Sequence, residues 1–320
     1  MDRIEAACVM AVLLSSLFLS ITALAGTETG EFCPTCPDWT NLEGWLAQRE
    51  AYERAQQSSA LRAEGLNSSP SVEESYPVPE LIAYAGPELM GEVVVLDVRS
   101  RKEFLAGHIP GARSLYWREM QRDGRLDPDL AVSALRRSGV NSSDRIVVCG
   151  GSDEGAAFVF WALSYLGHRN ISLLDGGVDA AWSSGIAPES GEPPALQSNY
   201  TAHTVPWLCV TEENLEGFLN LSDVRVLDAR DFSEYGRNML GNSSIPLTAE
   251  KLFDGSRIKD ASTLRDLLDR RALDDEGVVL VYGTPQAYWL FYCLSLMGYN
   301  ATLLEGDWWM ETPWAVSKVH

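Results

Sequence analysis

The chain has 320 residues, of which 46% are hydrophobic and 22% are charged, a composition typical of a folded globular protein. The 25 Lys and Arg against 45 Asp and Glu leave a formal net charge of −20. This balance excludes nucleic acid and anionic lipid surfaces as main partners, because binding to them depends on basic side chains. Six cysteines are too few for a fold built on disulfides, and the length suggests about two domains.

The first 25 residues are predicted to direct the chain out of the cytoplasm. Residues 6–25 form an almost unbroken apolar run that closes on Ala23-Leu24-Ala25, the small-x-small pattern of a cleavage site. Asp2 and Glu5 outweigh Arg3, where a signal peptide usually has net positive charge, and the run is long enough for an uncleaved anchor. Residues 1–25 are therefore interpreted as a signal peptide or N-terminal anchor of a secreted or extracytoplasmic protein, which touches a membrane only if the segment stays uncleaved.

Most asparagines lie in the acceptor pattern for N-glycosylation. Seven of the ten are followed by x-Ser or x-Thr, whereas chance and the enrichment of Asn and Ser in turns account for roughly one to three. The seven are Asn67, Asn141, Asn170, Asn199, Asn220, Asn242 and Asn300. Together with the apolar leader, they predict an exported glycoprotein.

Residues 26–75 begin with Cys33-Pro-Thr-Cys36 and continue into a predicted helix over 41–63 and a linker. Two cysteines without a neighbouring His or further Cys are too few for a zinc site, which takes four ligands. A thioredoxin-like site follows a strand, and none is predicted before them. In an exported protein we expect Cys33 and Cys36 to form a local disulfide.

From residue 76 onward, short apolar runs alternate with helical patterns. Strands are predicted at Val93–Asp97, Ile146–Cys149, Ile171–Leu174, Val224–Asp228, Val278–Tyr282 and Ala301–Leu304, and helices at Asp127–Arg137, Gly155–Leu166, Ser262–Arg271 and Pro285–Met297. Such alternation predicts parallel sheets covered by helices on both faces. A Pro-rich segment divides the pattern, so the predicted domains are 76–186 and 205–312, with a linker at 187–204 and a tail at 313–320.

The two predicted domains repeat each other in sequence. Val95–Arg99 (Val-Leu-Asp-Val-Arg) matches Val226–Arg230 (Val-Leu-Asp-Ala-Arg), and residues 166–176 match residues 297–306. The chain is therefore interpreted as a duplicated α/β domain.

These residues resemble the rhodanese family, and their layout resembles the tandem thiosulfate sulfurtransferases. The first half has Leu96-Asp97-Val98-Arg99, Glu103-Phe104 and the specific hexapeptide Gly107-His108-Ile109-Pro110-Gly111-Ala112. The second half is more distant and has Gly241-Asn-Ser-Ser-Ile-Pro246 in place of the hexapeptide. The resemblance implies two rhodanese-like domains, each a doubly wound, mostly parallel sheet of about five strands with helices on both faces.

The resemblance also implies a chemistry. In active members of the family, a cysteine in the loop after the strand that corresponds to 146–149 takes sulfane sulfur from thiosulfate or a similar donor. The resulting persulfide passes the sulfur to cyanide or a thiol. The implied partners are thus a small sulfur-containing anion and a thiol acceptor, with no metal and no organic cofactor. Loop N–H groups and a helix N-terminus lower the pKa of such a thiol and hold an anionic donor.

Cys149 is the candidate catalytic residue, and two registers place it differently. Counted back from Gly167, Cys149 takes the nucleophile position if the loop has the length common in tandem sulfurtransferases. With the shorter loop of single-domain members, Gly150 takes that position. The internal repeat favours the second register, because it aligns Cys149 with Tyr282. Both registers stay open at the level of the sequence.

The predicted active-site loop is unfavourable for an anionic donor. It consists of Gly150, Gly151, Ser152, Asp153, Glu154 and Gly155 and contains no Arg or Lys, where active family loops usually have one. Asp153 and Glu154 are expected to raise the pKa of a nearby thiol and to repel a dianion. A phosphatase of the Cys-x5-Arg type is excluded, because the Arg position is Gly155. The second half has no cysteine at the loop and is expected to be inactive.

Two functions follow from these residues. The first is an exported, sulfurtransferase-class protein that moves sulfur through a Cys149 persulfide, with Asp97 and Arg99 bracing the loop, as the family resemblance implies. The second is a catalytically inactive rhodanese-like module that binds a partner or serves as a structural surface component. The direction in which the Cys149 side chain points distinguishes them.

Overall fold

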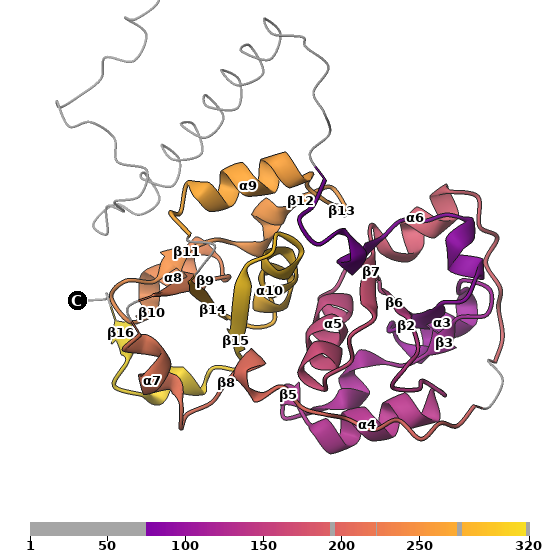
Figure 1. The fold of residues 1–320 in the computed structure, drawn as a ribbon, viewed down its shortest axis with the longest axis horizontal. Coiled ribbons are helices and arrows are strands. Elements are labelled where there is room, and N and C mark those ends of the chain that lie inside the picture. Colours follow the sequence, from indigo (N-terminus) through magenta and orange to yellow (C-terminus); the bar gives the residue numbers. More distant parts are fainter. Residues whose placement is uncertain (1–74, 193–195, 222, 274–276, 318–320) are drawn as a thin grey trace, which may run out of the picture. The chain divides into compact units, whose positions relative to one another are not determined.

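The structure is a computed structural model and describes residues 75–192, 196–221, 223–273 and 277–317 (Figure 1). The predicted leader, the Cys33–Cys36 disulfide and the Asn67 sequon lie outside the described residues. No helix within these four ranges is long and apolar enough to cross a membrane.

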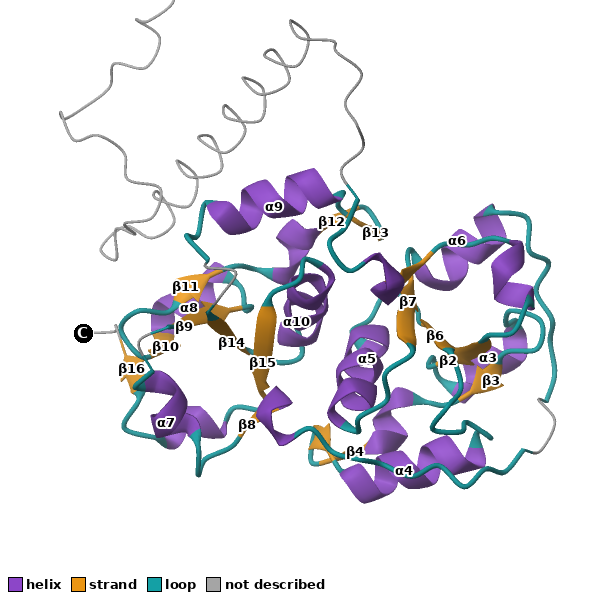
Figure 2. Ribbon diagram, in the orientation of Figure 1, coloured by secondary structure: helices purple, strands orange, loops and turns teal. Residues whose placement is uncertain are grey.

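The first half is a parallel sheet of five strands. Its strands, in spatial order, are β1 (Ile82–Ala83), β7 (Ile171–Leu174), β6 (Ile146–Cys149), β2 (Val94–Asp97) and β3 (Arg113–Ser114). Its helices are α3 (Arg101–Ala106), α4 (Pro128–Arg137), α5 (Gly155–Tyr165) and α6 (Gly177–Ser183). Alternate strand residues face opposite sides. One face packs against α4 and α5, the other against α3 and α6 (Figure 2).

The second half repeats this arrangement. Its strands, in spatial order, are β11 (Ile245–Pro246), β9 (Val224–Asp228), β14 (Val278–Tyr282), β15 (Asn300–Leu304) and β8 (Cys209–Val210), all parallel. Its helices are α7 (Leu215–Leu219), α8 (Phe232–Arg237), α9 (Ala261–Asp269) and α10 (Ala287–Leu296). The predicted fold class, two sheets of five parallel strands flanked by helices, is confirmed.

Three antiparallel pairs of strands complete the fold. A hairpin in the first half joins β4 (Gln121–Arg122) to β5 (Arg125–Leu126), and one in the second half joins β12 (Phe253–Asp254) to β13 (Arg257–Ile258). The third pair joins β10 (Asn238–Leu240) to β16 (Ala315–Ser317). Strand β16 lies within the predicted tail, where the sequence indicated no element.

Side-chain caps place the helix starts. Ser100 and Glu103 form a capping box at α3, and Asp127 accepts two backbone N–H groups at the start of α4, where Pro128 takes the first helical position. Asp260 caps α9 by accepting the backbone N–H of Thr263. Each cap accepts hydrogen bonds from backbone N–H groups that the helix itself leaves unpaired. Such a cap typically contributes about 1 kcal/mol to stability.

Helices α5 and α10 join the two halves. Both are apolar on every side, and Figure 1 shows them next to each other between the two sheets. The ring centroids of Phe158 and Tyr288 lie 5.2 Å apart, and those of Phe160 and Tyr292 lie 4.8 Å apart, both edge to face. One continuous cluster of buried side chains therefore spans both halves, as expected of helices that are hydrophobic all round.

Candidate functional site

Strand pairing places Cys149 and Tyr282 at equivalent positions. Cys149, the last residue of β6, pairs with Asp97 of β2, and Tyr282, the last residue of β14, pairs with Asp228 of β9. The structure thus aligns Cys149 with Tyr282, as the internal repeat does. In this register, the first residue of the loop is Gly150, one position after the cysteine.

The Cys149 side chain points into the protein. It is 0% exposed and packs in a cluster between the first sheet and helices α3 and α6. That cluster contains Leu89, Val95, Phe104, Ile109, Ala112, Val147, Leu174, Val178 and Ala181. Burial raises the pKa of the Cys149 thiol well above its usual value, Asp97 and Asp179 raise it further, and Arg99 opposes them. The thiol is therefore neutral in this conformation, whereas a sulfur nucleophile must be a thiolate.

The position of Gly150 has no room for a nucleophilic side chain either. A Cβ atom added there would lie 2.8 Å from the Cβ of Ala156 in α5, closer than real Cβ atoms approach. The Gly150 carbonyl oxygen accepts the N–H of Val178, which holds the strand end against α6. The start of this loop is therefore packed as core.

The Asp153 carboxylate accepts the N–H groups that lie at the end of the loop. Gly151, Ser152 and Asp153 are exposed. The Asp153 carboxylate accepts the Gly155 N–H at 3.2 Å and the Trp117 indole N–H at 3.0 Å. Glu154 carries a second carboxylate at the start of α5. An external anion at this helix start would have to displace the Asp153 carboxylate. The sequence alone did not reveal these contacts of Asp153.

Arg99 lies below the loop, as a bracing role requires. Its guanidinium is paired with Asp97, with 2.6 Å between Nη2 and Oδ2, and donates to the Gly107 carbonyl at 2.7 Å. A Cβ atom at Gly151 would lie 3.7 Å from the Arg99 Cδ atom. Bracing of the loop by Asp97 and Arg99 stays a prediction with a suitable geometry.

The second half has a more buried version of the same pair. Arg230 and Asp228 are joined at 2.6 Å. The Arg230 guanidinium also lies 5.4 Å from the Tyr282 ring centroid and 5.1 Å from that of Trp309. Its loop continues with Gly283, Thr284 and a cis Pro285 and contains no thiol.

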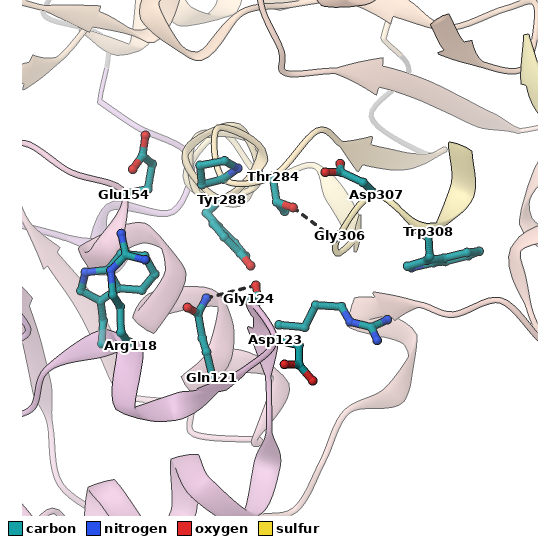
Figure 3. A pocket seen from close by; sticks show the side chains of 13 residues that line it. Arg118, Gln121, Asp123, Gly124, Glu154, Thr284, Tyr288, Gly306, Asp307 and Trp308 are labelled. Carbon is teal, nitrogen blue, oxygen red and sulfur yellow. Dashed lines mark hydrogen bonds between the residues drawn. The ribbon is translucent and has the colours of Figure 1, made fainter. Parts of the chain in front are cut away.

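A cavity of about 550 Å³ lies between the two halves. Glu154 borders it from the first loop, and Thr284 and Pro285 border it from the second, so both loops end at one cavity (Figure 3). Figure 3 shows Gln121, Asp123 and Gly124 of the β4–β5 hairpin facing Thr284 and Tyr288 of the second half. No sequence motif indicated this cavity, because it forms only where the two repeats pack together.

The cavity lining carries both signs of charge. Carboxylates come from Asp123, Glu154 and Asp307, and guanidinium groups from Arg118 and Arg125. Arg118 lies 4.4 Å from the centroid of the Trp117 ring. In the part of the chain that the structure describes, none of the three carboxylate side chains has an ion-pair or hydrogen-bond partner. Trp117, Tyr288 and Trp308 add aromatic surface.

The sequons within the described residues lie at the surface. The asparagines that are exposed are Asn170, Asn199, Asn220, Asn242 and Asn300. Asn141 is half-buried, with its Nδ2 atom 3.5 Å from Asp144 Oδ1. These positions suit glycosylation, which stays a prediction.

Known proteins resemble this chain in sequence. Residues 87–184 match the family described as rhodanese-like domain. A thiosulfate sulfurtransferase of Corynebacterium glutamicum is 26% identical over 274 residues, which cover 73% of this chain and 88% of that protein. The 3-mercaptopyruvate sulfurtransferase of Rattus norvegicus is 30% identical over 144 residues, 41% of this chain and 47% of that protein.

Solved structures show the same architecture. The crystal structure of SseA from Escherichia coli, described as a 3-mercaptopyruvate sulfotransferase, superposes with a TM-score of 0.63 at 18% identity, over 71% of this chain and 98% of that one. Fold and repeat together define a tandem α/β protein of the rhodanese type. The first half therefore contains a rhodanese-like domain. The chain as a whole is similar in sequence to thiosulfate and 3-mercaptopyruvate sulfurtransferases and has the fold of a solved structure of that kind.

Proposed function

We propose that this protein is a catalytically silent rhodanese-like module that binds a ligand instead of transferring sulfur. The observation that carries the proposal is the complete burial of Cys149 among apolar side chains, one position before the loop. Sulfur transfer needs a thiolate that reaches the donor, and this thiol is neutral and enclosed. Tyr282 at the equivalent position of the second half supports the same interpretation, because both halves then use this position for the core.

The cavity between the halves is the place where we expect a ligand. Its three carboxylates outnumber its two guanidinium groups, so the field inside disfavours a dianion such as thiosulfate. Charges of both signs next to aromatic rings suit a small zwitterion, whose cationic end can lie over a ring face. Titration calorimetry with thiosulfate and with free aromatic and basic amino acids tests this expectation, which a measurable affinity for thiosulfate alone would contradict.

Sulfur transfer through Cys149 is the second candidate, and the homology to sulfurtransferases favours it. The Cys149 thiolate would attack the outer sulfur of thiosulfate, form a Cys–S–S⁻ persulfide and release sulfite. Cyanide would then take that sulfur as thiocyanate and regenerate the thiolate. The strand end at β6 has to open before the first step can occur.

One experiment separates the two candidates. The mature protein is incubated with thiosulfate and cyanide, and thiocyanate and the mass of the Cys149 peptide are measured, with Cys149→Ser as the matched control. We expect no thiocyanate above the control and no added sulfur on Cys149. Thiocyanate formation that disappears in Cys149→Ser, with one extra sulfur on the wild-type peptide, would overturn the silent module in favour of the enzyme.

We also infer that the protein is exported and N-glycosylated. The apolar leader and the seven sequons support this inference, and so does the exposure of five of their asparagines. Expression in a eukaryotic secretory host, followed by enzymatic removal of N-glycans, should lower the mass of the protein recovered from the medium. Protein that stays inside the cells without glycans would contradict export.

A further inference from the structure

The two halves exchange equivalent hydrogen bonds at the carboxyl ends of β7 and β15. Asp175, directly after β7, accepts the backbone N–H of Ile258 from the β12–β13 hairpin at 2.9 Å. Glu305, directly after β15, accepts the backbone N–H of Leu126 from the β4–β5 hairpin at 2.9 Å. Each half therefore places a hairpin on the carboxylate of the other half, and these two contacts hold the halves together at polar points outside the shared apolar core.

The two carboxylates differ in their other partners. Asp175 is also paired with Arg257, whose Nη1 atom lies 3.1 Å from Asp175 Oδ2. The Glu305 carboxyl accepts the hydroxyl of Tyr288 at 2.7 Å and, within the described residues, has no ion-pair partner. The Glu305 residue is only 6% exposed. A buried carboxylate without a paired cation is costly, because its charge has lost most of its hydration.

The groups that face Glu305 come from four elements. Tyr288 of α10 donates a hydrogen bond, and the hydroxyl of Tyr165 in α5 and the thiol of Cys209 in β8 lie near enough to interact electrostatically. Arg125 of β5 is the cation among them, and its side chain is exposed. Burial raises the pKa of Glu305 to about 7, although the Tyr288 and Leu126 hydrogen bonds and Arg125 act in the opposite direction.

We propose that Glu305 is a pH-sensitive latch between the halves. The neutral carboxyl is compatible with burial under the β4–β5 hairpin, whereas the ionised carboxylate, which has no ion-pair partner in the described residues, regains its hydration when the hairpin leaves. The same hairpin supplies Gln121, Asp123 and Arg125 to the cavity. Rising pH therefore loosens one wall of the cavity, whereas the Asp175 carboxylate at the equivalent contact has Arg257 as its ion-pair partner.

The direction of the effect follows from proton linkage. When the hairpin leaves, Glu305 meets water and its pKa returns toward its ordinary value of 4.5, whereas in the closed contact it is about 7. Between these values the closed form binds the extra proton, so the open population rises roughly tenfold for each pH unit. Across the whole range between these two pKa values, the open population increases about 300-fold. It stops rising above about pH 7.

Native-state hydrogen exchange on the full chain tests the latch, because the two amides that meet the carboxylates are its reporters. Protection of the Leu126 and Ile258 amides is measured from about pH 5 to about pH 8 and corrected for the intrinsic exchange rate. We expect Leu126 protection to fall about tenfold per unit up to about pH 7. This fall should be steeper than that of Ile258 protection, because the Ile258 acceptor Asp175 has Arg257 as an ion-pair partner. Equal pH profiles for the two amides would overturn the proposal.

Two variants make the test specific. Glu305→Gln cannot ionise, so its Leu126 amide should lose the pH dependence, whereas Asp175→Asn should weaken protection of Ile258 and leave the Leu126 profile as in the wild type. A Glu305→Gln protein that keeps the wild-type slope would contradict the assignment to Glu305. If that variant does not fold, the comparison of the two amides in the wild-type protein still decides. None of these readouts depends on sulfur transfer or on a bound ligand.

Discussion

The two halves use the same strand end differently. Cys149 closes the first central strand and lies in a small apolar cluster, whereas Tyr282 closes the second and its hydroxyl accepts the Leu240 N–H at 3.1 Å. Both side chains point to the face of their sheet away from α5 and α10. This position therefore belongs to the core in both repeats, and a thiol there is not by itself an active site.

The largest expected difference between the halves is in the loss of stability when the arginine of the buried ion pair below each loop is removed. We expect Arg230→Ala to lower the free energy of unfolding by about 3–5 kcal/mol, because it leaves Asp228 buried and unpaired. Arg99→Ala should cost less, since the Arg99 side chain is 10% exposed against 4% for Arg230 and lacks the stacking on two rings. Urea unfolding of both variants measures this. Equal losses would mean that the two pairs are equivalent despite their different surroundings.

The carboxylates at the strand ends predict a pH effect on stability. The pKa of Glu305 is raised from 4.5 to about 7 in the folded chain. The folded state therefore holds more protons in that range, and stability falls as pH rises through it. We expect the wild type to lose up to about 3 kcal/mol relative to Glu305→Gln between about pH 4.5 and pH 7.

Urea unfolding of the two proteins at matched pH values measures this difference. A wild-type curve parallel to that of Glu305→Gln would contradict the prediction.

Two substitutions at Cys149 distinguish a core thiol from a loop thiol. Cys149→Ala removes one buried sulfur, whereas Cys149→Ser places a hydroxyl of similar size among apolar side chains that offer it no acceptor. We expect the serine variant to be less stable than the alanine variant by about 1–2 kcal/mol. Thermal and urea unfolding measure the difference. If the serine variant is as stable as the wild type, the side chain reaches polar groups or water.

The smallest effect is expected at the loop itself. Asp153→Ala removes the acceptor for the Gly155 and Trp117 N–H groups and should cost about 1 kcal/mol, a typical net contribution of a hydrogen bond. Ser152→Ala, at an exposed neighbouring position, is the control and should be neutral within about 0.5 kcal/mol. A neutral Asp153→Ala would show that water replaces the carboxylate at these donors without loss.

The long central strands were predictable. The boundaries of the strands at Ile146–Cys149, Ile171–Leu174, Val224–Asp228 and Val278–Tyr282 agree with the prediction residue for residue, because buried parallel strands read as short apolar runs. The four predicted helices within the described residues agree with the structure within two residues at each end. The predicted helix over 41–63 lies outside those residues, and the short helices α3, α6, α7 and α8 were not predicted. The edge strands β1, β3, β8 and β11 were not predicted, because each has two residues and is too short to show a pattern.

The candidate site was predictable only in part. The sequence indicated the loop at 150–155, its acidic residues and the two possible registers for Cys149. The structural equivalence of Cys149 and Tyr282 follows from the pairing of β6 with β2 and of β14 with β9. The role of Asp153 as an acceptor for the Trp117 indole N–H depends on the position of Trp117, which is 36 residues away in sequence.

The amino-acid sequence by itself determined that this protein is a duplicated α/β chain of the rhodanese type, because apolar runs, turn residues and repeated motifs are local properties. Tertiary structure decided which groups are buried and what they meet. The enclosure of Cys149, the cavity between the loops and the contact of Glu305 with Leu126 all depend on side chains that come together across the sheet or between the halves. The Glu305–Leu126 contact joins residues 179 positions apart, a distance over which no local pattern carries information.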